Sequence, residues 1–448
     1  MHKQILSLIF LLIVINAKSQ DAGDEWSLEK CINYAIQNSL QVQQASLNQN
    51  QAQLTKKQAI WAQAPTINGG FRNGVNFGRS VDLTSYEFNT IPTLTSGLSL
   101  NLNGVMFQGG QIRNTIKQSK IDLEAAEQDV QQAKNDVALS VAQAYLSILL
   151  AEENKGVLEE QAKVTQAQYE QTLKLIKGGV LAENSKYDLE AQIARDEENI
   201  VVAQNSIDLA YVTLKTLMNI DVSRAMSIQS TSDLEVEESL EVATLDEVYA
   251  DAVTNQPNIL ASKLRERSAE IAVKIAKGAF WPTISYYGGI SSNFSTGFKY
   301  PNTDDVVPYF LQLGGTFSGN IGVNVSVPIF NGFRTKIGVQ RAELGTKIAE
   351  LATTQLETTL KSNIERALTD IRAAQRRLVA SQKSVIATRL SVDNTRKRYD
   401  LGVVNSFELT SVQNTLIAAE SSVLQAKYDY LFKLKILDYY RGKPITIK

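Results

Sequence analysis

Histidine and cysteine are almost absent from this chain of 448 residues, which contains one of each, His2 and Cys31. These two residue types supply many of the general bases and most of the zinc ligands in proteins. A single cysteine excludes a disulfide within one chain. Cleavage of the signal segment described below would remove His2, and the mature chain would then contain no catalytic triad and no Cys/His metal centre. We expect Cys31 to be a buried structural residue, because it shares a helical pattern with Leu28 and Ile32. No motif sets two carboxylates in a recognisable pocket, so the sequence predicts neither an enzyme nor a cofactor or metal site.

Excess charge and a long hydrophobic run are also missing. The formal net charge is −2 and there is no basic block, which excludes nucleic acid as a partner. The apolar run Ile5–Ile15 is shorter than the roughly 20 residues of a transmembrane helix. It follows Lys3 and precedes the small residues Ala17 and Ser19. Residues 1–19 therefore resemble a secretory signal, and we expect them to be cleaved off.

Proline is missing between Thr93 and Gln256. Within this stretch, apolar or small residues recur every seven positions, at Ile116, Leu123, Val130, Val137, Ala144, Ala151 and Leu158. Sustained heptads indicate a long helix packed in a coiled coil. At about 1.5 Å per residue, a helix over 111–177 is roughly 100 Å long. The chain is therefore expected to build something elongated.

The sequence repeats itself. An offset of 217 aligns identical residue types early in the two copies, among them Pro65 with Pro282. An offset of 223 aligns later ones, among them Gly179 with Gly402. Such self-similarity predicts one structural unit present twice, with the first copy ending near residue 243.

Each copy is expected to contain helices, a pair of strands, a long helix and a return helix. The predicted ranges are helices 27–64, strands 65–110, long helix 111–177 and return helix 185–218 within 20–243, and helices 244–281, strands 282–333, long helix 335–400 and return helix 405–438 within 244–448.

Alternation with a period of two marks the strands. Leu98, Leu100 and Leu102, for example, alternate with small polar residues. One apolar and one polar face, with about 9 to 11 residues per crossing, suit a transmembrane barrel. The alternative is two soluble hairpins that cap a coiled coil. Four strands cannot close a membrane barrel, so other copies of the chain would have to complete it.

The secretory signal and this doubled plan together resemble the TolC-like outer-membrane efflux protein family (outer membrane factors). The residues that carry the resemblance are Leu28, Ala35, Pro65, Phe107, Gly109, Gly179 and Gly402. The resemblance implies a mixed α/β membrane protein in the outer membrane of a Gram-negative bacterium, with a large periplasmic portion. Long coiled-coil helices would form an α-barrel, and each chain would contribute four strands to a trimeric 12-stranded transmembrane β-barrel.

The implied function is the exit duct of a tripartite efflux or type I secretion system. Its partners would be two further copies of the chain, outer-membrane lipid, a periplasmic adaptor (membrane fusion protein) and an inner-membrane transporter. Two alternatives stay open: a periplasmic or secreted coiled-coil scaffold, and a stand-alone diffusion porin.

The resemblance also implies a periplasmic gate formed by Asp188, Tyr399, Glu408 and Ser411. Asp188 with Tyr399 is similar to the family's closing hydrogen bond, and three Glu408 side chains around a narrow axis would favour cations. Two positions depart from the best-known members, in which a basic residue replaces Val404 and an acid replaces Ser411.

The glycine turns after the long helices are the expected adaptor-docking tips. The residues concerned are Gly178, Gly179, Val180, Leu181, Gly402, Val403 and Val404. Exposed valine and leucine pairs at a helix end are uncommon unless a partner covers them. Packing of these helix ends within a trimer is the alternative.

Overall fold

The computed structural model describes residues 25–81, 88–229, 243–301 and 303–443. The predicted signal segment, residues 1–19, lies outside them. The chain divides into two compact units, which are described separately. The first unit comprises Met1–Ser46, Asp129–Ile259 and Leu356–Lys448, and the second comprises Leu47–Gln128 and Leu260–Gln355.

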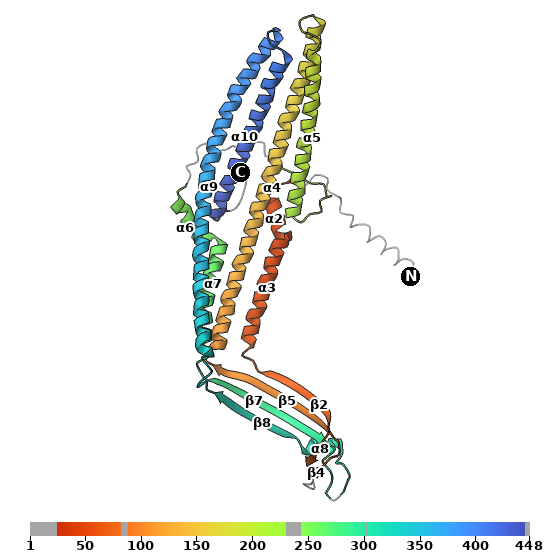
Figure 1. Ribbon diagram of the computed structural model, residues 1–448, viewed down its shortest axis with the longest axis vertical. Helices are drawn as coiled ribbons and strands as arrows, with labels where there is room; N and C mark the ends of the chain where they lie inside the picture. Colours follow the sequence, from red (N-terminus) through yellow and green to blue (C-terminus); the bar gives the residue numbers. More distant parts are fainter. Residues whose placement is uncertain (1–24, 82–87, 230–242, 302, 444–448) are drawn as a thin grey trace, which may run out of the picture. The chain divides into compact units, whose positions relative to one another are not determined.

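Helices account for most of the fold (Figure 1). They are α2 (Leu28–Asn38), α3 (Leu40–Trp61), α4 (Gln111–Lys177), α5 (Ser185–Leu217), α6 (Leu245–Asn255), α7 (Pro257–Gly278), α8 (Tyr309–Gly315), α9 (Arg334–Asp400) and α10 (Ser406–Tyr440). The two long helices, α4 and α9, contain 67 residues each. Among the residues described, no helix combines the length and apolar character needed to cross a membrane.

Each early helical segment is interrupted once. Ser39, between α2 and α3, and Gln256, between α6 and α7, both have extended backbones. Their N–H groups donate to the carbonyl oxygens of Ala35 and Ala252, respectively. Pro257 explains the second break, since a proline disfavours helical geometry in the residue before it. The two breaks lie at equivalent positions of the repeat.

Two apolar clusters form the core of the first unit. One packs α2 and the end of α5 against α4, and it contains the heptad positions Val137 and Ala144. Tyr145 in this cluster donates its hydroxyl to the carbonyl oxygen of Trp26 at 3.2 Å or of Gln229 at 3.0 Å. These carbonyls lie beside the parallel pair formed by β1 (Glu25–Trp26) and β6 (Ser227–Ile228). The other cluster packs α6, α9 and α10 together. The predicted coiled-coil seam of α4 is confirmed at the buried heptad positions.

A four-stranded antiparallel sheet belongs to the second unit. Its order is β2 (Thr66–Asn76), β5 (Thr93–Gln108), β7 (Thr283–Ser295), β8 (Ser318–Ser326), so β2 and β8 are the edge strands. A short hairpin, β3 (Ser80–Val81) with β4 (Phe88–Asn89), follows β2. The prediction of four strands per chain is confirmed.

The sheet has one apolar and one polar face, as the period of two predicts. The apolar face carries eight exposed residues, Ile67, Phe71, Leu98, Leu100, Ile290, Ile321, Val323 and Val325. Neighbouring positions such as Ser99 and Asn101 point to the polar face. Two tyrosines cover glycines on the adjacent strand: a Cβ on Gly104 would meet the ring of Tyr286, and one on Gly322 would meet Tyr287. These contacts help to set the strand register.

Candidate functional site at the helix turns and open edges

Two similar turns reverse the chain in the first unit, one between α4 and α5 and one between α9 and α10. Gly179 and Gly402 have φ values of 74° and 71°, a conformation that side chains other than glycine rarely adopt. The next residues, Val180 and Val403, donate their N–H groups to Leu175 and Arg398 at 3.0 and 2.9 Å. This is the usual glycine-terminated helix end. In both copies, the turn therefore forms because a glycine in the left-handed conformation ends the long helix.

The predicted gate residues Asp188 and Tyr399 have other partners than the resemblance implies. The Oδ2 atom of Asp188 accepts a hydrogen bond from Ser406 Oγ at 2.6 Å. Tyr399 is 1% exposed, and its hydroxyl lies 2.9 Å from Thr172 Oγ1. In the part of the chain that the structure describes, no direct Asp188–Tyr399 hydrogen bond forms, because each group is satisfied by a nearer hydroxyl. That implied contact is thus replaced by two separate ones.

These bonds connect the two helix pairs. Asp188 on α5 reaches Ser406 on α10, and Thr172 on α4 reaches Tyr399 on α9. A third bond joins Gln171 Nε2 on α4 to a carboxylate oxygen of Asp400 on α9, at 2.9 Å. Burial raises the pKa of Tyr399, and the charges of Asp400 and Asp188 raise it further, although its bond with Thr172 acts against this. The phenol is therefore neutral at physiological pH.

The burial of apolar residues at the turns shows that part of the docking prediction is wrong, because Val404 is not exposed. Val404 is 6% exposed and packs with Tyr399 and Leu409, while Leu181 lies half-buried against them. Val180 and Val403 are 54% and 64% exposed. At the second turn, Val404 thus faces the apolar cluster while its neighbour Val403 faces solvent. Only one member of each predicted pair is thus available to a partner.

Glu408 and Ser411 lie on the first turns of α10. The N–H of Glu408 donates to Asn405 Oδ1 at 2.9 Å, which caps the helix. Its carboxylate lies 3.3 Å from Arg398 Nη1, and both side chains are about half exposed. Ser411 is exposed, and its carbonyl oxygen accepts the hydroxyl of Thr415. The structure therefore places the Arg398 guanidinium beside Glu408, whose three copies were expected to form a ring of unpaired negative charges.

Several residues of this site were missed in the sequence. Arg398, Thr172 and Ser406 supply the partners of the predicted residues. Leu401 and Phe407 are 77% and 75% exposed beside the second turn. The last two had a visible signal, because a large apolar residue within two positions of a helix end or a helix cap is unusual on a solvated end. The hydroxyl partners had none, since they are common in these helices.

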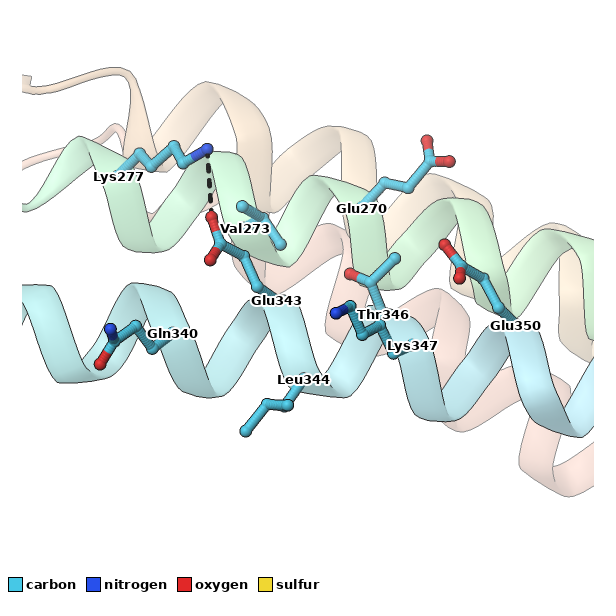
Figure 2. Close-up of a pocket in the computed structure, with 9 residues that line it drawn as sticks. All are labelled: Glu270, Val273, Lys277, Gln340, Glu343, Leu344, Thr346, Lys347 and Glu350. Atoms are coloured by element: carbon cyan, nitrogen blue, oxygen red, sulfur yellow. Dashed lines mark ion pairs between the residues drawn. The ribbon is translucent and has the colours of Figure 1, made fainter.

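A groove in the second unit lies between α7 and α9 (Figure 2). Its volume is about 740 Å³, and charges of both signs line it. Lys277 and Glu343 form an ion pair across it at 3.4 Å. Among the described residues, no group of three His, Cys, Asp or Glu side chains is placed to hold a metal ion. The groove is a charged seam between helices, and Leu344 is among the residues that line it.

Among the described residues of a single chain, both edges of the second unit lack a partner. Along α3, Leu47, Leu54 and Trp61 recur every seven residues and are 62%, 62% and 72% exposed. Along α9, the same spacing gives an exposed stripe of Ile337, Leu344 and Leu351. We call these the edge stripes. The α3 stripe leads into edge strand β2, and edge strand β8 leads into the α9 stripe.

Known proteins share this architecture. The chain is 21% identical to the outer membrane efflux protein BepC of Brucella suis, over 75% of this chain and 69% of that protein. It is 22% identical to the outer membrane protein TolC of Vibrio cholerae, over 71% and 72%. The solved structure of the Vibrio cholerae outer membrane protein VceC superimposes with a TM-score of 0.74 at 20% identity, covering 93% of this chain and 96% of that one.

A family model decides the assignment. The model that describes outer membrane efflux proteins matches residues 31–219 and 248–440, which include both helix turns and all four strands of the sheet. The expected family, outer-membrane location and duct function are therefore confirmed. With its two open edges and paired helix turns, the chain belongs to the outer membrane efflux protein family and forms an outer-membrane exit duct for efflux.

Proposed function

We propose that three copies of this chain join edge to edge into a closed tube. The observation that carries the proposal is the agreement between sheet and helices: β2 and α3 form one open edge, and β8 and α9 form the other. An open strand edge in lipid costs several kcal/mol for each unpaired backbone group, and an exposed heptad stripe favours a helical partner. Pairing β8 with β2 of the next copy satisfies both. Three copies supply 12 strands, as the resemblance to the TolC-like family implies.

The direction of the chain specifies which stripe residues meet. Helix α3 ends where β2 begins, and α9 begins where β8 ends, so the two stripes run in opposite directions. Equal steps of seven then place Trp61 level with Ile337, Leu54 with Leu344 and Leu47 with Leu351 of the neighbouring copy. These pairs are close enough for cross-linking only if the edges join in this way.

Cysteine cross-linking tests the assembly. In a Cys31→Ala background, Leu54→Cys combined with Leu344→Cys is expected to give covalent dimers and trimers on oxidation, since each contact joins two copies. The matched control pairs Gln53→Cys, about 100° further round α3, with Leu344→Cys. Equal cross-linking in the control, or none in the test pair while detergent extracts an intact oligomer, would disprove this register.

The proposed duct works with a periplasmic adaptor and an inner-membrane transporter, which supplies the energy, so the chain itself is not an enzyme. The helix-turn end receives the adaptor. Val180 and Val403, with Leu401 and Phe407, give this end an exposed apolar surface that suits a protein partner.

The same end is proposed to contain the gate. The bonds Asp188–Ser406 and Tyr399–Thr172 hold the two helix pairs of one chain together. Glu408 with Arg398, and Ser411 further along α10, lie beside these contacts. Breaking the bonds between pairs would let α9 and α10 move away from α4 and α5 and widen the opening.

A further inference from the structure

Helix α8 is fixed to the end of the sheet where β7 ends and β8 begins (Figure 1). Gln312 is 2% exposed, and its side-chain amide replaces a strand partner for β7. It accepts the N–H of Ser295 at 2.9 Å and donates to the carbonyl oxygens of Ser295 and Val307. Thr316 Oγ1 likewise accepts the N–H of Asn293 at 2.9 Å and lies 2.6 Å from its carbonyl oxygen. The helix is therefore a built part of the sheet.

The contacts of α8 show which face of the sheet it covers. Ser96 and Ser292 alternate in phase with Leu98 and Ile290, so they belong to the apolar face. Both serines are buried beneath α8. The Ser96 hydroxyl lies 3.1 Å from the Tyr309 hydroxyl, and Ser292 donates to the carbonyl oxygen of Leu313 at 2.6 Å. The ring of Phe294 packs on Tyr309, with centroids 4.8 Å apart.

In an outer-membrane barrel, the apolar face of the strands contacts lipid and the polar face lines the interior. Two serine hydroxyls on that face would lack partners in hydrocarbon, which is costly. The contacts from Tyr309 and Leu313 satisfy both hydroxyls and shield them. Helix α8 thus covers the part of the lipid-facing surface that is too polar to meet lipid directly.

The opposite side of α8 is apolar and exposed. Because successive helical residues are about 100° apart, Phe310 and Leu311 point away from the side that holds the sheet contacts. They are 84% and 58% exposed. Phe317, 64% exposed, continues the alternation of Ile321 and Val323 and so joins α8 to the apolar face of the sheet.

We propose that α8 is an interfacial helix whose exposed apolar side contacts membrane lipid. Phe310, Leu311 and Phe317 insert at the outer-leaflet boundary and extend the lipid-facing surface beyond the strands. Continuity with the apolar face selects lipid over a second copy. Neighbouring chains join at the edges β2 and β8, whereas α8 lies on the face of the sheet.

Spin labelling of the full-length protein in liposomes tests the proposal. Nitroxides are placed at Phe310→Cys and Leu311→Cys in the Cys31→Ala background, and collision with oxygen, which is enriched in lipid, is compared with collision with a water-soluble nickel chelate. Ile321→Cys, on the apolar face, is the control for lipid contact. Asp305→Cys, exposed in the same connection between β7 and β8, is the control for water.

The labels at 310 and 311 are expected to favour oxygen over nickel several-fold more than the label at 305, approaching the label at 321. A nickel accessibility equal to that at 305 would overturn the proposal, because it would place the helix in water. An immobilised label that neither reagent reaches would overturn it too, since a protein contact would then cover this side. Each variant is first shown to extract as the same oligomer as the parent.

Discussion

At the scale of single residues, the helix turns are held by a small number of polar contacts. A typical net contribution of an intramolecular hydrogen bond is about 1 kcal/mol. The bonds of Asp188 with Ser406 and of Tyr399 with Thr172 therefore contribute only a few kcal/mol to holding the two helix pairs together. In the proposed gate, a contribution of that size can be overcome by a partner protein that binds the separated helices better.

Removing both hydroxyls that serve this closure is expected to make the channel leak. Tyr399→Phe with Ser406→Ala eliminates about 2 kcal/mol of contact, which raises the open population roughly 30-fold. Conductance of the purified protein in planar bilayers measures this. Thr415→Ala is the matched control, because it removes a hydroxyl bond within α10 alone. Unchanged conductance of the double variant would show that other contacts hold the turns closed.

Sequence patterns predict some of these residues and not others. Asp188 and Tyr399 could be selected from their positions relative to the glycine turns, but their partners Ser406 and Thr172 could not. Hydroxyl residues recur throughout these helices, and only the three-dimensional packing determines which of them meet. The burial of Val404 was unforeseeable for the same reason: the direction of its side chain depends on the path of the turn.

At the scale of elements, long regular patterns were the most informative. The heptads predict a helix over 111–177, and α4 spans Gln111–Lys177. The alternation predicts strands on both sides of each polar loop, and the sheet contains them. Helix α8 has no such pattern, because seven residues contain too few turns to show a period. The interruption at Ser39 was hidden as well, since no proline marks it.

Glycines at the junctions between elements differ in how strongly they are required. Gly109 joins β5 to α4 with a φ of 56°, and a Cβ there would collide with the carbonyl oxygen of Gly278 at the end of α7. Gly332, its repeat equivalent before α9, has a φ of 63° but open space around it. Alanine at either position incurs the left-handed backbone cost of about 1–2 kcal/mol.

Gly109→Ala is expected to be the more damaging of the two, because α7 must also move. The temperature at which the oligomer dissociates in SDS should fall further for Gly109→Ala than for the matched control Gly332→Ala. Equal falls would show that the close approach to Gly278 contributes nothing beyond the backbone conformation.

At the scale of the whole molecule, the surfaces proposed for assembly and for docking are different. The edge stripes and edge strands belong to the second unit, and the exposed turn residues belong to the first. A substitution at one surface should therefore leave the function of the other intact. This separation makes the proposed docking role testable in living cells.

Val403→Asp is expected to reduce export at least tenfold, since a charge in an apolar contact easily costs the 1.4 kcal/mol that corresponds to a tenfold loss of affinity. The oligomer in the membrane should be unaffected. Val201→Asp is the matched control, because Val201 is 68% exposed but lies in the body of α5. Loss of the oligomer with Val403→Asp would instead assign this residue to packing of the helix ends.

The strand order also determines how late in synthesis the sheet can be completed. Strand β5 must pair with β7, which the ribosome produces almost two hundred residues later, after the whole of α4 and α5. Until β7 is made, the β5 edge of the β2–β5 hairpin has no partner strand. In the proposed assembly, the β2 edge stays unpaired until another chain joins. Such delayed pairing exposes strands that aggregate readily. In the proposed assembly, the sheet of each chain is therefore complete only after its second half has been made, and the barrel closes only after the neighbouring chains have joined.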